Sequence, residues 1–207
     1  VSSVGTGTAD LANPSGSTAT LEEIASYNSN GETTGDKMQT VSYDFLGYGY
    51  IGLNALNMKV GTSEDDIDSA ESKALRKGIA TILAAYRDIT IDSYYGDAAK
   101  VINYSISDCS WAAPQSTDAG YEVAYSVDVD GNPIYTSDMT DDQKFDAALQ
   151  AAIGYFKAAG YTWDDATGKF TAAPEGAKMS YEVIIPGGGT GDHPVYLLLE
   201  YAREALD

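Results

Sequence analysis

The strongest constraint on the fold is an amphipathic helix that the sequence predicts from Asp66 to about Arg87. Apolar residues recur there at steps of three and four, the spacing that places side chains on one face of an α-helix. They are Ile67, Ala70, Ala74, Leu75, Gly78, Ile79, Ile82, Leu83 and Tyr86. We expect this face to lie in the core. Gly78 within it predicts a close approach by a second backbone.

A second amphipathic helix is predicted from Thr140 to Ala159. Thr140 and Gln143 match a capping box, in which each side chain accepts a hydrogen bond from the backbone N–H of the other residue. Gly160 ends the helix, because glycine readily takes the left-handed conformation found after a last turn. The apolar face is formed by Phe145, Ala148, Leu149, Ala152, Tyr155, Phe156 and Ala159.

Two shorter helices are also expected. Thr20 and Glu23 form another capping-box pattern, which predicts a short helix to about Asn28. The last helix is predicted from about Asp192 to Leu206.

Several stretches rich in β-branched and aromatic residues favour strands. They cover residues 38–44, 48–54, 121–129, 134–135 and 180–185. Asp130-Gly131 is typical of a hairpin turn, and residues 121–139 form a probable hairpin insertion. Residues 1–18, rich in Ser, Thr and Gly, predict a loose opening segment. Strands alternating with helices predict an α/β fold class.

Composition excludes several kinds of partner. The 207 residues include 31 acidic and 12 basic side chains, for a formal net charge of -19. A nucleic acid backbone needs Lys and Arg to replace its counterions, and an anionic bilayer repels an acidic surface. No apolar run is long enough to span a bilayer, so we expect no membrane insertion of this segment. Cys109 is the single cysteine, which excludes an internal disulfide.

A glycine-rich loop at Gly187–Gly191 is the best candidate site. It lies between a predicted strand and a predicted helix, where glycines let a backbone approach a ligand and the helix offers free N–H donors. It matches neither a Walker loop nor a dinucleotide-binding glycine pattern. The same residues also fit a plain connector, with Thr190 or Asp192 as the N-cap and Pro194 in the first turn.

Other polar residues give no sign of catalysis or of a metal. His193 is the only histidine and has no zinc partners at suitable spacing. The Asp128–Gly131 string lacks the remaining oxygen ligands of a calcium loop. Neighbouring carboxylates occur at helix starts or turns, where they complement the helix dipole or face water. They are Glu64-Asp65-Asp66, Asp141-Asp142 and Asp164-Asp165. We therefore expect no catalytic residues, no metal and no cofactor.

Several short motifs follow one another in a fixed order. They are Tyr50-Ile51-Gly52-Leu53-Asn54, a helix ending at Tyr86-Arg87, Gly96-Asp97-Ala98-Ala99, a Pro-bearing loop from Trp111 to Pro114, Ala158-Ala159-Gly160-Tyr161, and a strand and loop from Tyr181 to His193. Their order resembles the second lobe of extracellular solute-binding proteins of family 5, the oligopeptide- and dipeptide-binding subunits of ABC importers. The resemblance covers most of residues 40–207. It departs from the family in the hairpin at 121–139 and in the long spacing from Arg76 to Arg87.

The resemblance implies a truncated lobe like that of type II periplasmic-binding proteins, with a mixed sheet flanked by helices. Residues 1–207 would be part of the second ligand-binding lobe, and the first lobe of the same protein would be missing. The implied partners are a peptide or small-molecule ligand, that first lobe and an ABC permease. The implied location is extracellular, either lipid-anchored at the cell surface or periplasmic. The ligand-binding residues would be Asn54, Tyr95, Gly188, Gly189, Thr190 and His193.

Two other functions stay open. One is a secreted hydrolase domain that uses paired carboxylates, and the other is a surface adhesion module. The identity of the ligand also stays open, because proteins of this family carry solutes other than peptides.

Overall fold

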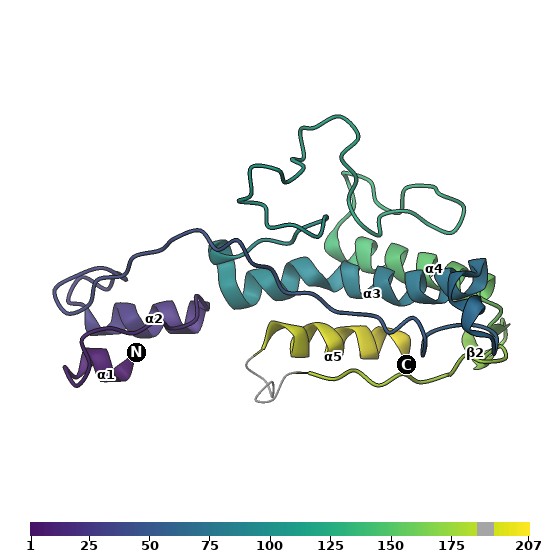
Figure 1. Ribbon diagram of the computed structural model, residues 1–207, viewed down its shortest axis with the longest axis horizontal. Helices are drawn as coiled ribbons and strands as arrows, with labels where there is room; N and C mark the ends of the chain where they lie inside the picture. The colour runs from purple at the N-terminus through teal and green to yellow at the C-terminus, as the bar shows by residue number, and fades with distance from the viewer. Residues whose placement is uncertain (186–192) are drawn as a thin grey trace. The chain divides into compact units, whose positions relative to one another are not determined.

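The computed structural model describes residues 1–185 and 193–207 (Figure 1). It is mostly helical, with 40% of residues in helices and 4% in strands. The α-helices of the described residues are α1 (Ser2–Gly5), α2 (Thr18–Tyr27), α3 (Ala70–Tyr95), α4 (Asp141–Ala158) and α5 (Pro194–Leu206). Two 3-10 turns are η1 (Glu64–Asp68) and η2 (Gly96–Ala98), and the strands are β1 (Thr162–Asp164) and β2 (Lys169–Ala172).

The chain divides into two compact units. Unit 1 contains residues 1–48 and 88–118, and unit 2 contains residues 49–87 and 119–207. Helix α3 contributes its residues up to Arg87 to unit 2 and the remainder to unit 1.

The expected α/β class is wrong for the described residues. Strands were predicted at 38–44, 48–54 and 180–185, yet none of these stretches is a strand, and Ile184 is 95% exposed. The mixed sheet flanked by helices, expected of a type II periplasmic-binding lobe, is therefore not present there. An alternating pattern shows that a stretch is able to pair, but pairing also needs a partner strand in register.

The hairpin that does form is local, and it lies outside the stretches in which strands are expected. Strands β1 and β2 pair antiparallel, with Trp163 opposite Phe170. The Asp164 carboxylate accepts hydrogen bonds from the Ala166 N–H at 2.9 Å and from the Thr167 hydroxyl at 2.7 Å. Gly168 closes the turn at φ 65°. These strands are only three and four residues long, too short for alternation to reveal them.

The core of unit 2 lies among α3, α4 and α5, which run alongside one another (Figure 1). Its buried members are Ala74, Leu75, Ile82, Ala152, Tyr155, Phe156, Ala159, Tyr161 and Ala202. Tyr86 of α3 links the helices, because its ring lies 4.7 Å from that of Phe145 on α4 and 5.6 Å from that of Tyr201 on α5. The predicted apolar faces of the two long helices thus form this core.

Gly78 does sit at a close approach, but the neighbour is a side chain and not a backbone. A Cβ added at Gly78 would lie 2.9 Å from Cε1 of Phe156. The phenyl ring occupies the space that any larger residue would fill. Glycine is needed there for packing between α3 and α4.

Helix α4 begins and ends as predicted. The Thr140 hydroxyl accepts from the Gln143 N–H at 3.3 Å, and the Thr140 N–H donates to Gln143 Oε1 at 2.8 Å. At the other end Gly160 has φ 92°, the left-handed conformation, and β1 follows.

Unit 1 begins with α1 and α2. The N-cap of α2 is Ser17, whose hydroxyl accepts from the Thr20 N–H, so the predicted cap at Thr20 is three residues too late. After α2, the buried Asn28 organises a loop: its Oδ1 accepts from the Lys37 and Met38 N–H groups, and its Nδ2 donates to the Met38 carbonyl.

Residues 121–139 contain one isolated bridge, between Val127 and Pro133, and no strand that is longer than this bridge. Tyr155 of α4 donates its hydroxyl to the carbonyls of Val127 and Asp128, which ties this segment to α4. No helix among the residues that the structure describes is both long and apolar enough to cross a bilayer.

Candidate functional site

His193 is the N-cap of α5. Its Nδ1 accepts a hydrogen bond from the Val195 N–H at 3.2 Å, and Pro194 occupies the first helical position. Because Nδ1 is the acceptor, the neutral ring carries its hydrogen on Nε2. The side chain is half-buried, and within residues 1–185 and 193–207 its Nε2 makes no hydrogen bond.

Asn54 is exposed and closes a turn in unit 2. Its Oδ1 accepts from the N–H groups of Leu56 and Asn57, at 3.1 and 3.4 Å. The turn therefore uses the acceptor of the side-chain amide, and the two N–H donors of Nδ2 make no hydrogen bond in the described parts of the chain. No hydrogen bond joins Asn54 to His193 in the described parts of the chain.

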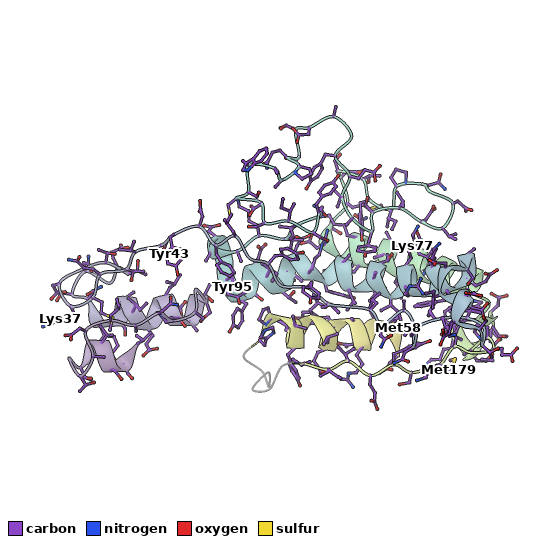
Figure 2. All side chains as sticks on the ribbon, viewed as in Figure 1. Lys37, Tyr43, Met58, Lys77, Tyr95 and Met179 are labelled. Atoms are coloured by element: carbon purple, nitrogen blue, oxygen red, sulfur yellow. The ribbon has the colours of Figure 1, made fainter. Side chains whose placement is uncertain are left out.

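Tyr95 belongs to unit 1, at the end of α3. Tyr95 is labelled in Figure 2. Its ring packs edge-on against Tyr94 with 4.7 Å between centroids. Burial raises the pKa of the Tyr95 hydroxyl, and the neighbouring Tyr94 raises it further. The group is therefore a neutral hydroxyl that can donate or accept a hydrogen bond at physiological pH.

The remaining predicted ligand-binding residues, Gly188, Gly189 and Thr190, lie outside the described residues. Of the predicted site, the structure thus places Asn54 and His193 in unit 2 and Tyr95 in unit 1.

Three of the neighbouring carboxylates have identified local partners. Asp66 accepts from the Ser63 N–H at 2.8 Å as part of a capping box, and Asp141 pairs with Lys144 at 3.0 Å. Asp164 shapes the β1–β2 turn. Hydrogen bonds from Thr167 and Ala166 lower the pKa of Asp164, the opposite of what a catalytic acid requires.

The Asp128 carboxylate is hydrogen-bonded within its own turn. The Asp128 carboxylate accepts from the N–H groups of Asp130 and Asn132 and from Asn132 Nδ2. The backbone N–H of Asn132 is the main cause of the lowered pKa of Asp128. No group of three or more His, Cys, Asp or Glu side chains in the described ranges could hold a metal ion.

Sequence reasoning missed a hydrogen-bonded pair in unit 2, formed by the buried Tyr161 and the half-buried Tyr181. The Tyr161 hydroxyl donates to the Lys178 carbonyl at 2.7 Å and lies 3.3 Å from the Tyr181 hydroxyl. Burial, followed by the hydrogen bond with Tyr181, raises the pKa of Tyr161 well above its ordinary range. The sequence analysis names Tyr161 and Tyr181 in separate motifs, and nothing local in the sequence identifies a partner seventeen residues or more away.

Sequence reasoning also missed an exposed apolar surface in unit 1. Val41, Tyr43 and Phe45 are 84%, 73% and 74% exposed, and Trp111 is 98% exposed. Alternation at 41–45 was the available signal, but it was taken as evidence for a strand within a sheet.

Comparisons of the chain with protein-family models, with curated proteins and with solved structures find no match.

Proposed function

We propose that this chain is a segment of the substrate-binding component of an ABC importer, and that it helps to bind peptides or related small solutes outside the cell. The main support is the order of motifs from Tyr50 to His193, which resembles solute-binding proteins of family 5. The mixed sheet that this resemblance implies is not present in the described residues, so the proposal rests on the order of the motifs and on the geometry of His193. Its partners would be the ligand, a first lobe and a permease.

The observation that carries the proposal is the geometry of His193. The N-cap hydrogen bond fixes the ring at the start of α5 and uses Nδ1. The Nε2–H is then a fixed donor, of the kind that recognises a peptide carbonyl or carboxylate directly or through water. Its place two residues after the glycine-rich sequence Gly187–Gly191 adds to this support.

Asn54 offers similar chemistry. Its turn holds Oδ1, so the exposed Nδ2 is fixed as a donor for a carbonyl oxygen. Donors that are already ordered by other hydrogen bonds lose little side-chain entropy when a ligand binds.

The test is isothermal titration of the full-length receptor with a mixture of tripeptides to pentapeptides. His193→Asn replaces the N-cap acceptor Nδ1 by a side-chain oxygen and removes the imidazole Nε2–H, whereas His193→Ala removes both the acceptor and the Nε2–H. We expect both variants, and Asn54→Asp, to bind about tenfold more weakly, the loss of roughly one hydrogen bond. Asn13→Ala, an exposed change elsewhere, is the control.

Equal weakening by His193→Asn and His193→Ala assigns the effect to the ring and not to the cap. Unchanged affinity in all three variants would remove His193 and Asn54 from the site. A wild-type receptor that binds no peptide or small solute would overturn the proposed function itself.

A further inference from the structure

The segment Val41–Gly47 in unit 1 has backbone N–H groups that pair with no strand in the described residues, and it is called here the Val41–Gly47 edge. It follows the ordered Asn28 loop, which ends where the Thr40 N–H donates to the Thr34 hydroxyl at 3.2 Å. From Val41 to Gly47 there is no helix or strand, and no backbone N–H of these residues donates within the part of the chain that the structure describes. Unpaired N–H and C=O groups in a β-prone stretch are a template for another strand.

The side chains of this edge are apolar on one side. In an extended chain, alternate residues share a face, which places Val41, Tyr43 and Phe45 together. All three are at least 73% exposed, and Figure 2 labels Tyr43 on this stretch. Large apolar side chains gathered in this way are typical of an interaction surface.

The edge is fixed to a second segment of the same unit. The Phe45 carbonyl accepts hydrogen bonds from the Ser107 hydroxyl at 3.1 Å and from Cys109 Sγ at 3.3 Å. Ser107 is buried and begins a turn that the Ser110 N–H closes, and the exposed Trp111 lies in the next turn, which the Ala113 N–H closes on the Ser110 carbonyl. Trp111 thus follows the anchoring residues by one turn, which makes its indole a reporter for this part of unit 1.

The charge of unit 1 indicates which kind of partner binds the Val41–Gly47 edge. The unit carries eleven Asp and Glu side chains and two lysines, and Lys100 already pairs with Asp108 at 3.6 Å. Asp44 is the only charged residue from 38 to 58. A second copy of the chain, a nucleic acid and an anionic membrane would all be repelled, whereas a cationic chain would be attracted.

We propose that the Val41–Gly47 edge binds an extended, cationic peptide segment with apolar side chains, which adds to the edge as a strand. Backbone hydrogen bonds hold the segment, its apolar side chains pack on Val41, Tyr43 and Phe45, and its basic side chains meet Asp44 and the acidic surroundings. This surface is separate from Asn54 and His193, and the inference does not require the proposed function.

Trp111 provides the readout. In a Trp163→Phe chain Trp111 is the single tryptophan, and its exposed indole emits at long wavelength. The probe is a blocked peptide of alternating Lys and Val, compared with the same peptide with Glu for Lys and with Ser for Val. We expect the Lys–Val peptide to shift the emission to shorter wavelength. It should bind at least about tenfold more tightly than the Glu–Val and Lys–Ser peptides. Its binding should weaken as the NaCl concentration rises from about 0.05 to about 0.5 M.

Two further comparisons isolate the mechanism. N-methylation of alternate peptide nitrogens keeps charge and side chains but blocks strand pairing, so we expect binding to be lost. Phe45→Ser should weaken binding about tenfold, while Ile184→Ser, which removes a still more exposed apolar residue in unit 2, should not.

Four results would overturn the inference. Two of them are binding of the Glu–Val peptide, or of the N-methylated peptide, as tight as that of the Lys–Val peptide. The third is a shift of the Trp111 emission with protein concentration alone, which indicates a second copy. The fourth is a shift of the emission with phosphatidylcholine vesicles when the peptide causes none. None of these results bears on binding at His193, which the titration of the receptor measures.

Discussion

Gly78 decides how closely α3 and α4 approach each other. Its missing Cβ would lie 2.9 Å from a carbon of the buried Phe156 ring, closer than packed carbon atoms allow. Gly78→Ala should destabilise the protein by about 1 to 2 kcal/mol, because overpacking outweighs the better helix propensity of alanine. Urea unfolding followed by circular dichroism measures the change.

Gly154 on α4 is the matched control for Gly78. A Cβ there would lie 3.5 Å from Val129 Cγ1, an ordinary contact. Gly154→Ala should therefore stabilise the protein by about 0.5 to 1 kcal/mol. Equal effects of the two substitutions would contradict the packing of Phe156 against Gly78.

Tyr161 makes stability fall at alkaline pH. Its pKa is raised in the folded state, so above the ordinary value of 10.0 an unfolded tyrosine ionises while the folded one does not. The stability it contributes is present below pH 10 and is lost as pH rises above it. Between about pH 8 and about pH 11 the wild type should lose more unfolding free energy than Tyr161→Phe. Tyr43→Phe, at an exposed position, should behave as the wild type.

At the scale of elements, helix α4 depends on its N-cap. The reciprocal hydrogen bonds of Thr140 and Gln143 satisfy N–H groups that otherwise lack partners. Thr140→Ala should cost about 1 kcal/mol of unfolding free energy, while Thr140→Ser should cost much less. A thermal or urea transition that is the same for all three proteins would show that the capping box does not stabilise α4.

Elements whose determinants are close in sequence could be predicted, and the others could not. The apolar faces of α3 and α4, the cap at Thr140 and the stop at Gly160 all follow from residues within one or two turns. Strand pairing at 38–54 and 180–185 depends on a partner elsewhere, which alternation alone does not supply. The α2 cap was misplaced because Ser17 and Thr20 are both good N-caps, and only geometry separates them.

The candidate site shows the same limit. The resemblance implies a histidine just before the last helix, and His193 is there; it is the N-cap itself, in place of Thr190 or Asp192, and the helix begins at Pro194. Its tautomer and the role of Asn54 in a turn required coordinates. The Val41–Gly47 edge was visible only as an alternating pattern, because exposure is a property of everything around a residue and not of the residue itself.

At the scale of the whole molecule, the chain combines a helical core in unit 2 with an open, apolar strand edge in unit 1. Hydrogen–deuterium exchange of the free chain tests this combination most directly. The account predicts slow exchange for the amides of Leu75–Ile82 and Ala148–Phe156, and fast exchange, close to that of an unfolded chain, for those of Val41–Gly47. Protection of Val41–Gly47 equal to that of the helices would show that the segment is already paired in a sheet, and would contradict both the fold described here and the docking edge.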